Sequence, residues 1–294
     1  LHKSSPVWWE EGRAVYDVLR YDVLATPLGQ NLLCFPLFLK GLTHAVIGFE
    51  CIGPFLLFIP FFTSVVRTVT VFAFFCLQIG FGLSLHLQMF PWVSSVAMLP
   101  FLPTVFWDIC FKRSRKASSS ERVPPLRSSG WTNALVSFFL MYGFFWNLHN
   151  VEKFQMPTRL HWIAHALAID QYWGMFSPYP PREDGWYVVQ GRLKNGDQID
   201  PFQGGNSVRW EKPPDVFKSY KSFRWRKYLF QKWWQDEKVL FYFARYLCQD
   251  WNRHRKGEEV LEEIEIFFML EETLPEGEAP PERISAWKGS CPEG

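Results

Sequence analysis

Residues 28–110 read LGQNLLCFPLFLKGLTHAVIGFECIGPFLLFIPFFTSVVRTVTVFAFFCLQIGFGLSLHLQMFPWVSSVAMLPFLPTVFWDIC. Only four residues in this stretch carry a charge, namely Lys40, Glu50, Arg67 and Asp108. A helix that spans a bilayer needs about 20 mostly apolar residues, and several such helices fit here. The stretch therefore predicts a protein embedded in a membrane, and it argues against most classes of soluble enzyme.

About four transmembrane helices are expected in this chain, at about 42–63, 68–90, 92–110 and 131–148. A helix at the membrane surface, 13–23, and a short or re-entrant segment at 28–40 precede them. Residues 1–150 are thus expected to form an all-α membrane bundle. The chain begins with Leu1 rather than Met and has no signal peptide, so we expect the bundle to lack its first helices.

The loop between the last two expected spans is strongly basic. Its charged residues are Lys112, Arg113, Arg115, Lys116, Arg122 and Arg127, with only Glu121 opposing them. Short loops rich in Lys and Arg stay on the cytoplasmic side of a membrane. The final span then exits on the other side, so residues 151–294 are predicted to form an extracytoplasmic domain, most simply outside a bacterial inner membrane.

This second domain is predicted to be α+β with a small antiparallel sheet. The expected helices are 157–170, 215–235 and 236–253, and the expected strands are 186–193, 198–202, 208–211 and 264–270. Asn195-Gly196 predicts a type I′ turn between the first two strands. The tail after residue 274 is rich in Pro, Glu and Gly and is expected to be loose.

Composition and motifs exclude several functions. The net charge of +2 does not favour nucleic acid as a partner. The six cysteines form no C-x-x-C pair, although Cys248 and Cys291 can form a disulfide if their side of the membrane is oxidising. The chain has no G-x-S-x-G, Walker A or Rossmann fingerprint, so no serine-hydrolase or nucleotide-binding motif is present.

Polar residues inside apolar segments are the first candidates for function, because each is costly in a membrane. Lys40 and His44 would share a helix face, and Glu50 can neutralise Lys40 if the helices pack. One interpretation is a buried acid–base cluster with His86; the other is a snorkelling lysine with one structural ion pair. Arg67 and Asp108 stand at span ends, where they would anchor the boundaries.

Two further polar pairs carry less weight. His161 and His165 have the i, i+4 spacing of zinc-binding helices, but no Glu lies between them and no third ligand is evident, so no metal is expected. Glu183 and Asp184 are adjacent, and adjacent side chains point apart, so they predict a turn that caps the next strand rather than a two-carboxylate site.

Three stretches together resemble the HTTM proteins, the bacterial relatives of vitamin K-dependent gamma-carboxylase. They are WEEGRA at 9–14, the segment from GFG at 80–82 through MF at 89–90 to FWD at 106–108, and QYWGMFSP at 171–178 followed by DGWYV at 184–188. The matching positions are Trp9, Gly12, Gln78, Trp173, Phe176, Pro178, Asp184, Gly185 and Trp186.

The resemblance implies oxidation of reduced vitamin K, or another quinol, coupled to carboxylation of glutamate, with a lysine as the base. That lysine would stand just before Leu1, and Lys3 is displaced from its position by several residues. Gln78 stands where the carboxylase has a membrane histidine; a glutamine can form hydrogen bonds but cannot shuttle a proton at neutral pH.

Two functions follow as hypotheses. In the first, the chain belongs to a gamma-glutamyl carboxylase-like enzyme that modifies an extracytoplasmic protein or peptide, and Lys40, His44, Glu50 and His86 line its site within membrane lipid. In the second, the chain is a non-enzymatic membrane assembly or binding protein whose extracytoplasmic sheet, around 186–202, holds a partner.

Overall fold

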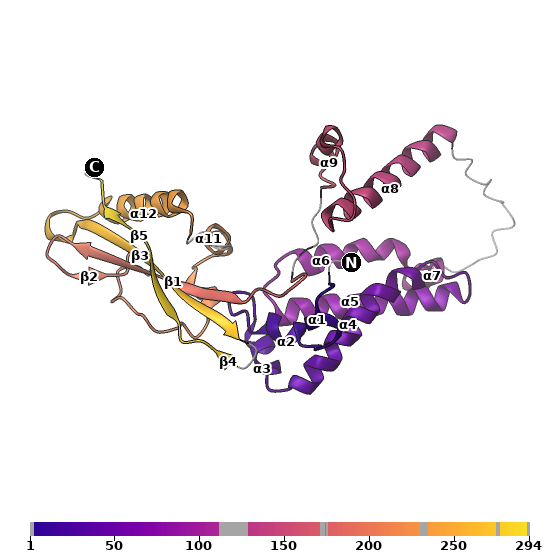
Figure 1. Cartoon of the computed structure of the whole chain (residues 1–294), viewed down its shortest axis with the longest axis horizontal. Helices are drawn as coiled ribbons and strands as arrows, with labels where there is room; N and C mark the ends of the chain where they lie inside the picture. Colours follow the sequence, from indigo (N-terminus) through magenta and orange to yellow (C-terminus); the bar gives the residue numbers. More distant parts are fainter. Residues whose placement is uncertain are drawn as a thin grey trace. The chain divides into compact units, whose positions relative to one another are not determined.

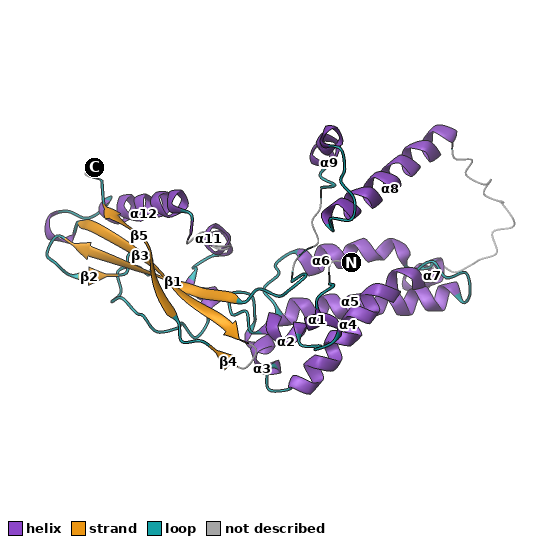
Figure 2. Cartoon of the chain, viewed as in Figure 1, coloured by secondary structure: helices purple, strands orange, loops and turns teal. Residues whose placement is uncertain are grey.

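The computed structural model of the chain describes residues 3–111, 129–170, 174, 176–229, 235–274 and 277–292. It divides into two compact units (Figures 1 and 2). Unit 1 comprises Leu1–Ala14, Lys40–Ile79 and Met89–Pro180, and unit 2 comprises Val15–Leu39, Gly80–Gln88 and Pro181–Gly294. The basic loop at 112–127 lies outside the described residues.

Helices supply the regular structure of the described residues up to 180, apart from an isolated β-bridge between Ala25 and Leu85. The helices are α1 Pro6–Trp9, α2 Ala14–Leu19, α3 Pro27–Leu32, α4 Pro36–Leu56, α5 Thr63–Ser84, α6 Phe90–Met98, η1 Leu99–Phe101, α7 Thr104–Cys110, α8 Gly130–Asn150, η2 Thr158–Leu160 and α9 His161–Leu167.

The expected bundle of four transmembrane helices is wrong. Among the described residues only α5 is long and apolar enough to cross a membrane, and a second span arises only if α6–η1 and α7 count as one. These two pieces bend by 106°, at the prolines Pro100 and Pro103. Helices α4 and α8 have the length of a span, but neither is apolar enough. Polar residues lower the mean hydropathy of both helices, for example Lys40 and Glu50 in α4 and Asn133 and Asn147 in α8.

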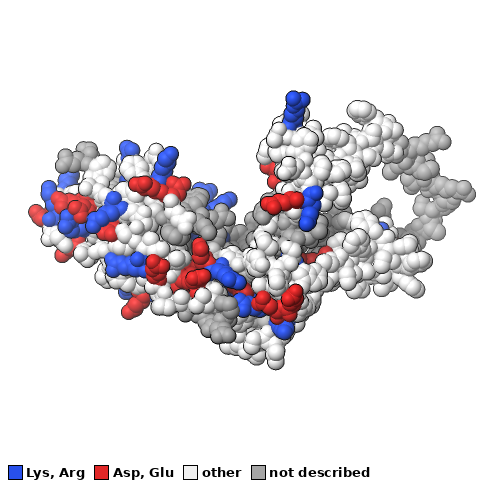
Figure 3. All heavy atoms as spheres, viewed as in Figure 1, with Lys and Arg blue, Asp and Glu red and all other residues white. Residues whose placement is uncertain are grey.

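Unit 1 nevertheless exposes large apolar side chains. Only 17% of the most apolar 18-residue window of α5 is buried. A helix in the core of a soluble protein would be mostly buried, so α5 does not have the burial of a core helix among the described residues. Phe55 on α4 is 75% exposed and Trp131 on α8 is 77% exposed. In Figure 3 charged atoms of this unit gather around α9, whereas the right-hand part, around α7 and the N-terminal half of α8, is almost free of blue and red atoms on the face shown. Such a surface has the composition of one that meets lipid or a partner.

Unit 2 contains the sheet and the helices that cover it. After residue 180 its elements are β1 Glu183–Leu193, β2 Gln198–Ile199, α10 Val216–Ser219, α11 Phe223–Leu229, α12 Glu237–Asn252, η4 Gly257–Glu259, β3 Leu261–Leu274, β4 Gly277–Glu278 and β5 Glu282–Ser290.

The sheet is antiparallel and has β3 at its centre. The strand order is β2-β1-β3-β4, and β5 also pairs with β3. Strands β1 and β3 pair along their length, from Glu183 opposite Glu272 to Leu193 opposite Leu261. Helix α12 packs on the sheet through a buried face that includes Leu240 and Phe243. The apolar core of unit 2 therefore lies between α12 and β1–β3 (Figure 2).

Several expectations for this half of the chain need correction. Residues 208–211 form no strand, and 215–235 is not one helix but α10 and α11, with 230–234 outside the described residues. The Asn195-Gly196 turn is not type I′, because only Gly196 has a positive φ, at 91°. The Leu193 carbonyl accepts from the Gly196 amide, which indicates a type I turn followed by a bulge at the glycine.

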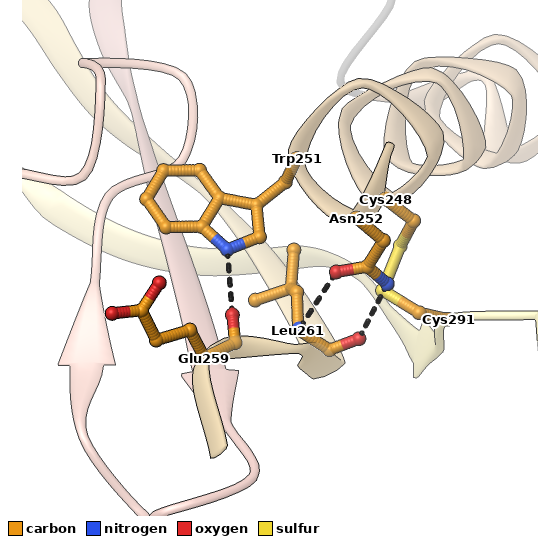
Figure 4. Close-up of a disulfide and its surroundings, with 6 residues drawn as sticks. All are labelled: Cys248, Trp251, Asn252, Glu259, Leu261 and Cys291. Carbon is orange, nitrogen blue, oxygen red and sulfur yellow. Dashed lines mark hydrogen bonds between the residues drawn. A yellow bond between two sulfur atoms is a disulfide. The ribbon is translucent and has the colours of Figure 1, made fainter. Parts of the chain in front are cut away.

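Within the tail after residue 274, residues 277–292 are ordered, contrary to expectation. Strand β5 pairs with β3 from Glu282 opposite Leu270 to Ser290 opposite Glu263. A disulfide between Cys248 on α12 and Cys291 then joins the end of β5 to the helix, with 5.5 Å between the Cα atoms (Figure 4). The pairing with β3 and the disulfide both stabilise a segment whose local sequence favours no particular secondary structure.

Candidate functional site

An ion pair between Lys3 and Glu50 is the central polar feature of unit 1. Lys3 Nζ lies 2.5 Å from Glu50 Oε2, and the two side chains are 22% and 33% exposed. The same ammonium lies 4.2 Å from the ring centroid of Trp8, whose side chain is buried. The pair therefore combines an acid, a base and a flat apolar surface in one place.

Hydrogen bonds hold the Lys3 segment in position. The indole N–H of Trp9 donates to the Lys3 carbonyl at 2.6 Å. The Ser5 hydroxyl donates to the carbonyl of Pro178 at 2.5 Å, and the indole N–H of Trp8 donates to the carbonyl of Phe176 at 3.3 Å. Three positions of the family motif, Trp9, Phe176 and Pro178, are therefore in direct contact with the segment that carries Lys3.

His44 on α4 contacts Trp9 and lies beside a fourth motif position, Gly12. Its Nε2 lies 3.1 Å from the Trp9 carbonyl and its Nδ1 lies 3.0 Å from the Lys40 carbonyl. Both partners are carbonyl oxygens, so whichever ring nitrogen carries a proton donates to one of them. Gly12 has φ +67°, and a Cβ there would lie 2.3 Å from His44 Cε1. Glycine at this position lets the loop approach the ring.

The structure does not bring Lys40 to Glu50. Both residues lie on α4, ten positions apart, which places them about 15 Å apart along the helix axis. Lys40 is exposed, and Glu50 pairs with Lys3 instead. The sequence suggested a contact between Lys40 and Glu50 because the expected span began at residue 42, which placed Lys40 outside the helix of Glu50.

His86 belongs to unit 2 and has separate neighbours. Its ring stacks on Phe217 of α10 with 3.9 Å between centroids, and burial lowers its pKa. The buried Arg226 of α11 donates to the carbonyls of Val23 and His86, at 3.0 Å and 3.4 Å. The role of Arg226 in holding these chain segments was not evident from sequence, since five cations of the segment 216–229 look alike there.

Asp184, another motif position, is a buried carboxylate of unit 2. It accepts from the amide of Gly185 at 2.7 Å and from the amide of Val23 at 3.3 Å. Burial raises its pKa to about 7, against the lowering effect of these amides. The residue lies inside β1 rather than in a turn before it. Glu183 beside it is exposed, so the two carboxylates do not form a pair.

The remaining motif positions are structural or lie outside the described residues. Gln78 on α5 is buried, and its side-chain oxygen has no hydrogen-bond partner among the described residues. A Cβ at Gly185 would lie 2.1 Å from the Met269 carbonyl, so glycine allows β1 to approach β3 there. Trp186 is a core residue that is 2% exposed. Trp173 lies outside the described residues.

The two histidines of α9 interact with their own surroundings. His161 Nε2 lies 3.2 Å from the Met156 carbonyl, and His165 Nδ1 lies 2.8 Å from an oxygen of Asp170. Within the described ranges, no three His, Cys, Asp or Glu residues lie close enough together to hold a metal ion.

No model of a protein family, no curated protein and no solved structure matches this chain. The resemblance to the HTTM proteins therefore depends on the motif residues alone, and the assignment of function depends on the geometry described above.

Proposed function

We propose that this chain is part of a membrane enzyme that performs quinol-dependent carboxylation or a related quinone-dependent modification, and that Lys3 and Glu50 are its proton-transfer pair. The ion pair beside Trp8 carries the proposal. It joins the Glu50 carboxylate of α4 to an amine on a segment held by Trp9, Phe176 and Pro178, the positions that resemble gamma-carboxylase.

The surroundings of the pair suit a quinol as substrate. The indole of Trp8 offers a flat apolar surface, and the amine and carboxylate offer hydrogen-bond partners for a hydroxyl group. Transfer of one proton within the pair, from the Lys3 ammonium to the Glu50 carboxylate, gives a neutral amine. This amine can accept the proton of a quinol hydroxyl, which leaves a quinolate ion beside the Lys3 ammonium.

Placement in a membrane is part of this proposal. It is supported by the length and apolar composition of α5, by the low burial of that helix and by the apolar side chains that α4 and α8 expose. The disulfide supports an oxidising, extracytoplasmic environment for unit 2, because disulfides persist outside the reducing cytosol.

The alternative, a partner-binding sheet around 186–202, is less well supported. Most of β1 is buried on both faces, including the successive residues Val188 and Val189, and Phe202 is 3% exposed. The residues assigned to the partner are thus in the core, where a substitution would affect stability before it affected binding.

The test uses the full-length protein in membranes, with reduced vitamin K, labelled CO₂ and peptides that contain glutamate. Lys3→Met and Glu50→Gln should each lower epoxide formation and label incorporation by about 100-fold or more, the usual range for loss of a general base. Lys40→Met, an exposed lysine on the helix of Glu50, is the matched control and should retain activity within a few fold. Membrane protein levels are compared for all three variants.

Two outcomes would contradict the proposal. Wild-type protein that forms neither epoxide nor labelled peptide would show that the chemistry does not belong to it. Activity that survives in both Lys3→Met and Glu50→Gln would show that the pair is structural and that the base lies elsewhere.

A further inference from the structure

A cleft of about 470 Å³ lies between α11 and α12 of unit 2. Its walls are mostly aromatic, with Trp225 and Tyr228 from α11 and Tyr242, Phe243 and Tyr246 from α12. Trp225 packs against Tyr246 with 5.1 Å between ring centroids. Tyr242 and Tyr246 are 61% and 46% exposed, so the walls reach the surface and the cleft is accessible to a ligand.

The rim of the cleft is cationic. Arg224 lines it, and Lys227 lies three residues further along α11, on the same side of that helix. Both are exposed, and neither forms an ion pair within the described part of the chain. Arg245 on α12, between the two exposed tyrosines, is exposed as well. The neighbouring Asp236 caps α12 through the amides of Lys238 and Val239.

The charge of the whole segment is one-sided. Residues 216–229 contain five cations and no acidic residue. Lys218 pairs with Asp215, and Arg226 is buried against backbone carbonyls. Lys221 lies over the ring of Phe202, 5.0 Å from its centroid. Arg224 and Lys227 are thus the exposed cations of this segment that have neither an ion pair nor a ring contact among the described residues. An exposed pair of cations beside an aromatic cleft suits a ligand that has both an anionic group and an apolar part.

The segment is attached to the end of α5. Arg226 donates to the carbonyl of His86, two residues after the last residue of α5, Ser84. His86 in turn stacks on Phe217 of α10. If α5 spans the membrane, as proposed above, Ser84 ends the span and α10–α11 lie at the level of the lipid headgroups. Trp and Tyr collect at this level, and cations there attract acidic lipids.

We propose that the cleft between α11 and α12 binds the headgroup of an acidic phospholipid, with Arg224, Lys227 and Arg245 at the phosphate and the exposed rings of Tyr242 and Tyr246 against the glycerol and upper acyl chain. This inference rests on the membrane placement proposed above. It assigns a lipid-binding role to a part of unit 2 that takes no part in the Lys3–Glu50 chemistry.

The test titrates the full chain, in a neutral detergent, with short-chain phosphatidylglycerol and follows Trp fluorescence and the thermal midpoint. Arg224→Gln with Lys227→Gln should weaken binding about 25-fold, since each cation near an acidic lipid surface contributes about fivefold. Lys194→Gln, which removes an exposed cation of unit 2 outside the cleft, should bind as the wild type does. Tyr246→Ala should weaken binding at unchanged charge.

Phosphatidylcholine and inorganic phosphate are titrated in parallel. Equal binding of inorganic phosphate would replace the lipid by a simple anion, and equal binding of phosphatidylcholine would remove the role of the cations. Wild-type affinity in the double variant would overturn the proposal outright. Extraction of the protein from membranes by alkaline carbonate would instead refute the membrane placement, so the two failures are distinguishable.

Discussion

The carboxylate of Asp184 accepts a hydrogen bond from the backbone amide of Val23, with 3.3 Å between oxygen and nitrogen. This bond joins β1 to the segment between α2 and α3, 161 residues earlier in the sequence. Arg226 binds the carbonyl of the same Val23. One residue of an irregular segment is thus held through its amide by a buried acid and through its carbonyl by a buried cation.

Stability should depend on pH through Asp184. Its folded-state pKa of about 7 exceeds the unfolded value of 3.8, so the folded state binds more protons between these values and stability falls as pH rises from about 4 to 7. The fall should reach about 4 kcal/mol at most and then level off. Asp200, whose pKa burial raises to about 6, contributes in the same direction.

Substitution of Asp184 separates its contribution from that of Asp200. Asp184→Asn should flatten the pH dependence of the thermal midpoint between pH 4 and 7, whereas Asp250→Asn, which changes an exposed acid on α12, should leave the slope as it is. Identical slopes in the wild type and in Asp184→Asn would show that this carboxyl is ionised throughout the range.

Gly12 should not tolerate a side chain. Gly12→Ala places a Cβ 2.3 Å from the His44 ring in a backbone conformation with φ +67°, so it should lower the free energy of unfolding by about 2 kcal/mol. Adding His44→Ala should recover the part due to the clash but not the part due to φ. Thermal unfolding in one detergent would measure all of the variants.

Gly41→Ala is the matched control for this prediction. Gly41 is in α4, one residue after Lys40, and a Cβ there meets nothing within 4 Å. Alanine in a helix should stabilise the protein by about 0.5–1 kcal/mol relative to glycine. If Gly12→Ala behaved like Gly41→Ala, the close approach of the loop to His44 would be refuted.

Local patterns predicted the elements that bury one regular face. The spacing of Leu240, Phe243, Ala244 and Leu247 located α12 to within a residue or two, and the alternation from Ile264 to Leu270 lies within β3. The same method failed for β5, because its order depends on pairing with β3 and on the bond to Cys248. Neither contact leaves a signal in the local composition of a segment rich in Pro, Glu and Gly.

The candidate site was predictable only in part. Glu50 was singled out because a carboxylate inside an apolar helix is costly. Its partner Lys3 was not, since the two residues are 47 positions apart and no periodicity relates them. The count of spans failed for a related reason. The two prolines of residues 92–110 indicate a kink, but apolar length alone does not reveal that the bend reaches 106°, or that polar residues lower the mean hydropathy of α4.

The disulfide should be detectable by counting reactive thiols. This chain has six cysteines, of which Cys34, Cys51, Cys76 and Cys110 are free. Denatured but unreduced protein should therefore incorporate four maleimide groups, and reduced protein should incorporate six, as measured by intact mass. Six groups before reduction would refute the pairing. Cys248→Ser should cost up to about 4 kcal/mol, since 43 residues separate the partners, whereas Cys34→Ser should leave the pair intact.

Among the cations of unit 2 that bind carboxylates, Lys212 should be the one whose substitution costs the most folding stability. Its Nζ lies 2.5 Å from an oxygen of Asp22 and 2.6 Å from an oxygen of Glu271, and these two acids are only 16% and 12% exposed. Although burial opposes the charge, the two carboxylates raise the Lys212 pKa, so its contribution is complete below the unfolded value and is lost only at strongly alkaline pH.

Lys212→Met should therefore cost about 1–3 kcal/mol at neutral pH, because it leaves two poorly solvated carboxylates facing each other. Adding Glu271→Gln should recover part of this loss by removing the repulsion. Lys288→Met is the control, since Lys288 is 64% exposed in its pair with Glu265 and should cost less than about 1 kcal/mol. Equal losses in the two single variants would mean that the Asp22–Lys212–Glu271 bridge is no stronger than a surface ion pair. The segment before α3 would then be held mainly by Asp184 and Arg226.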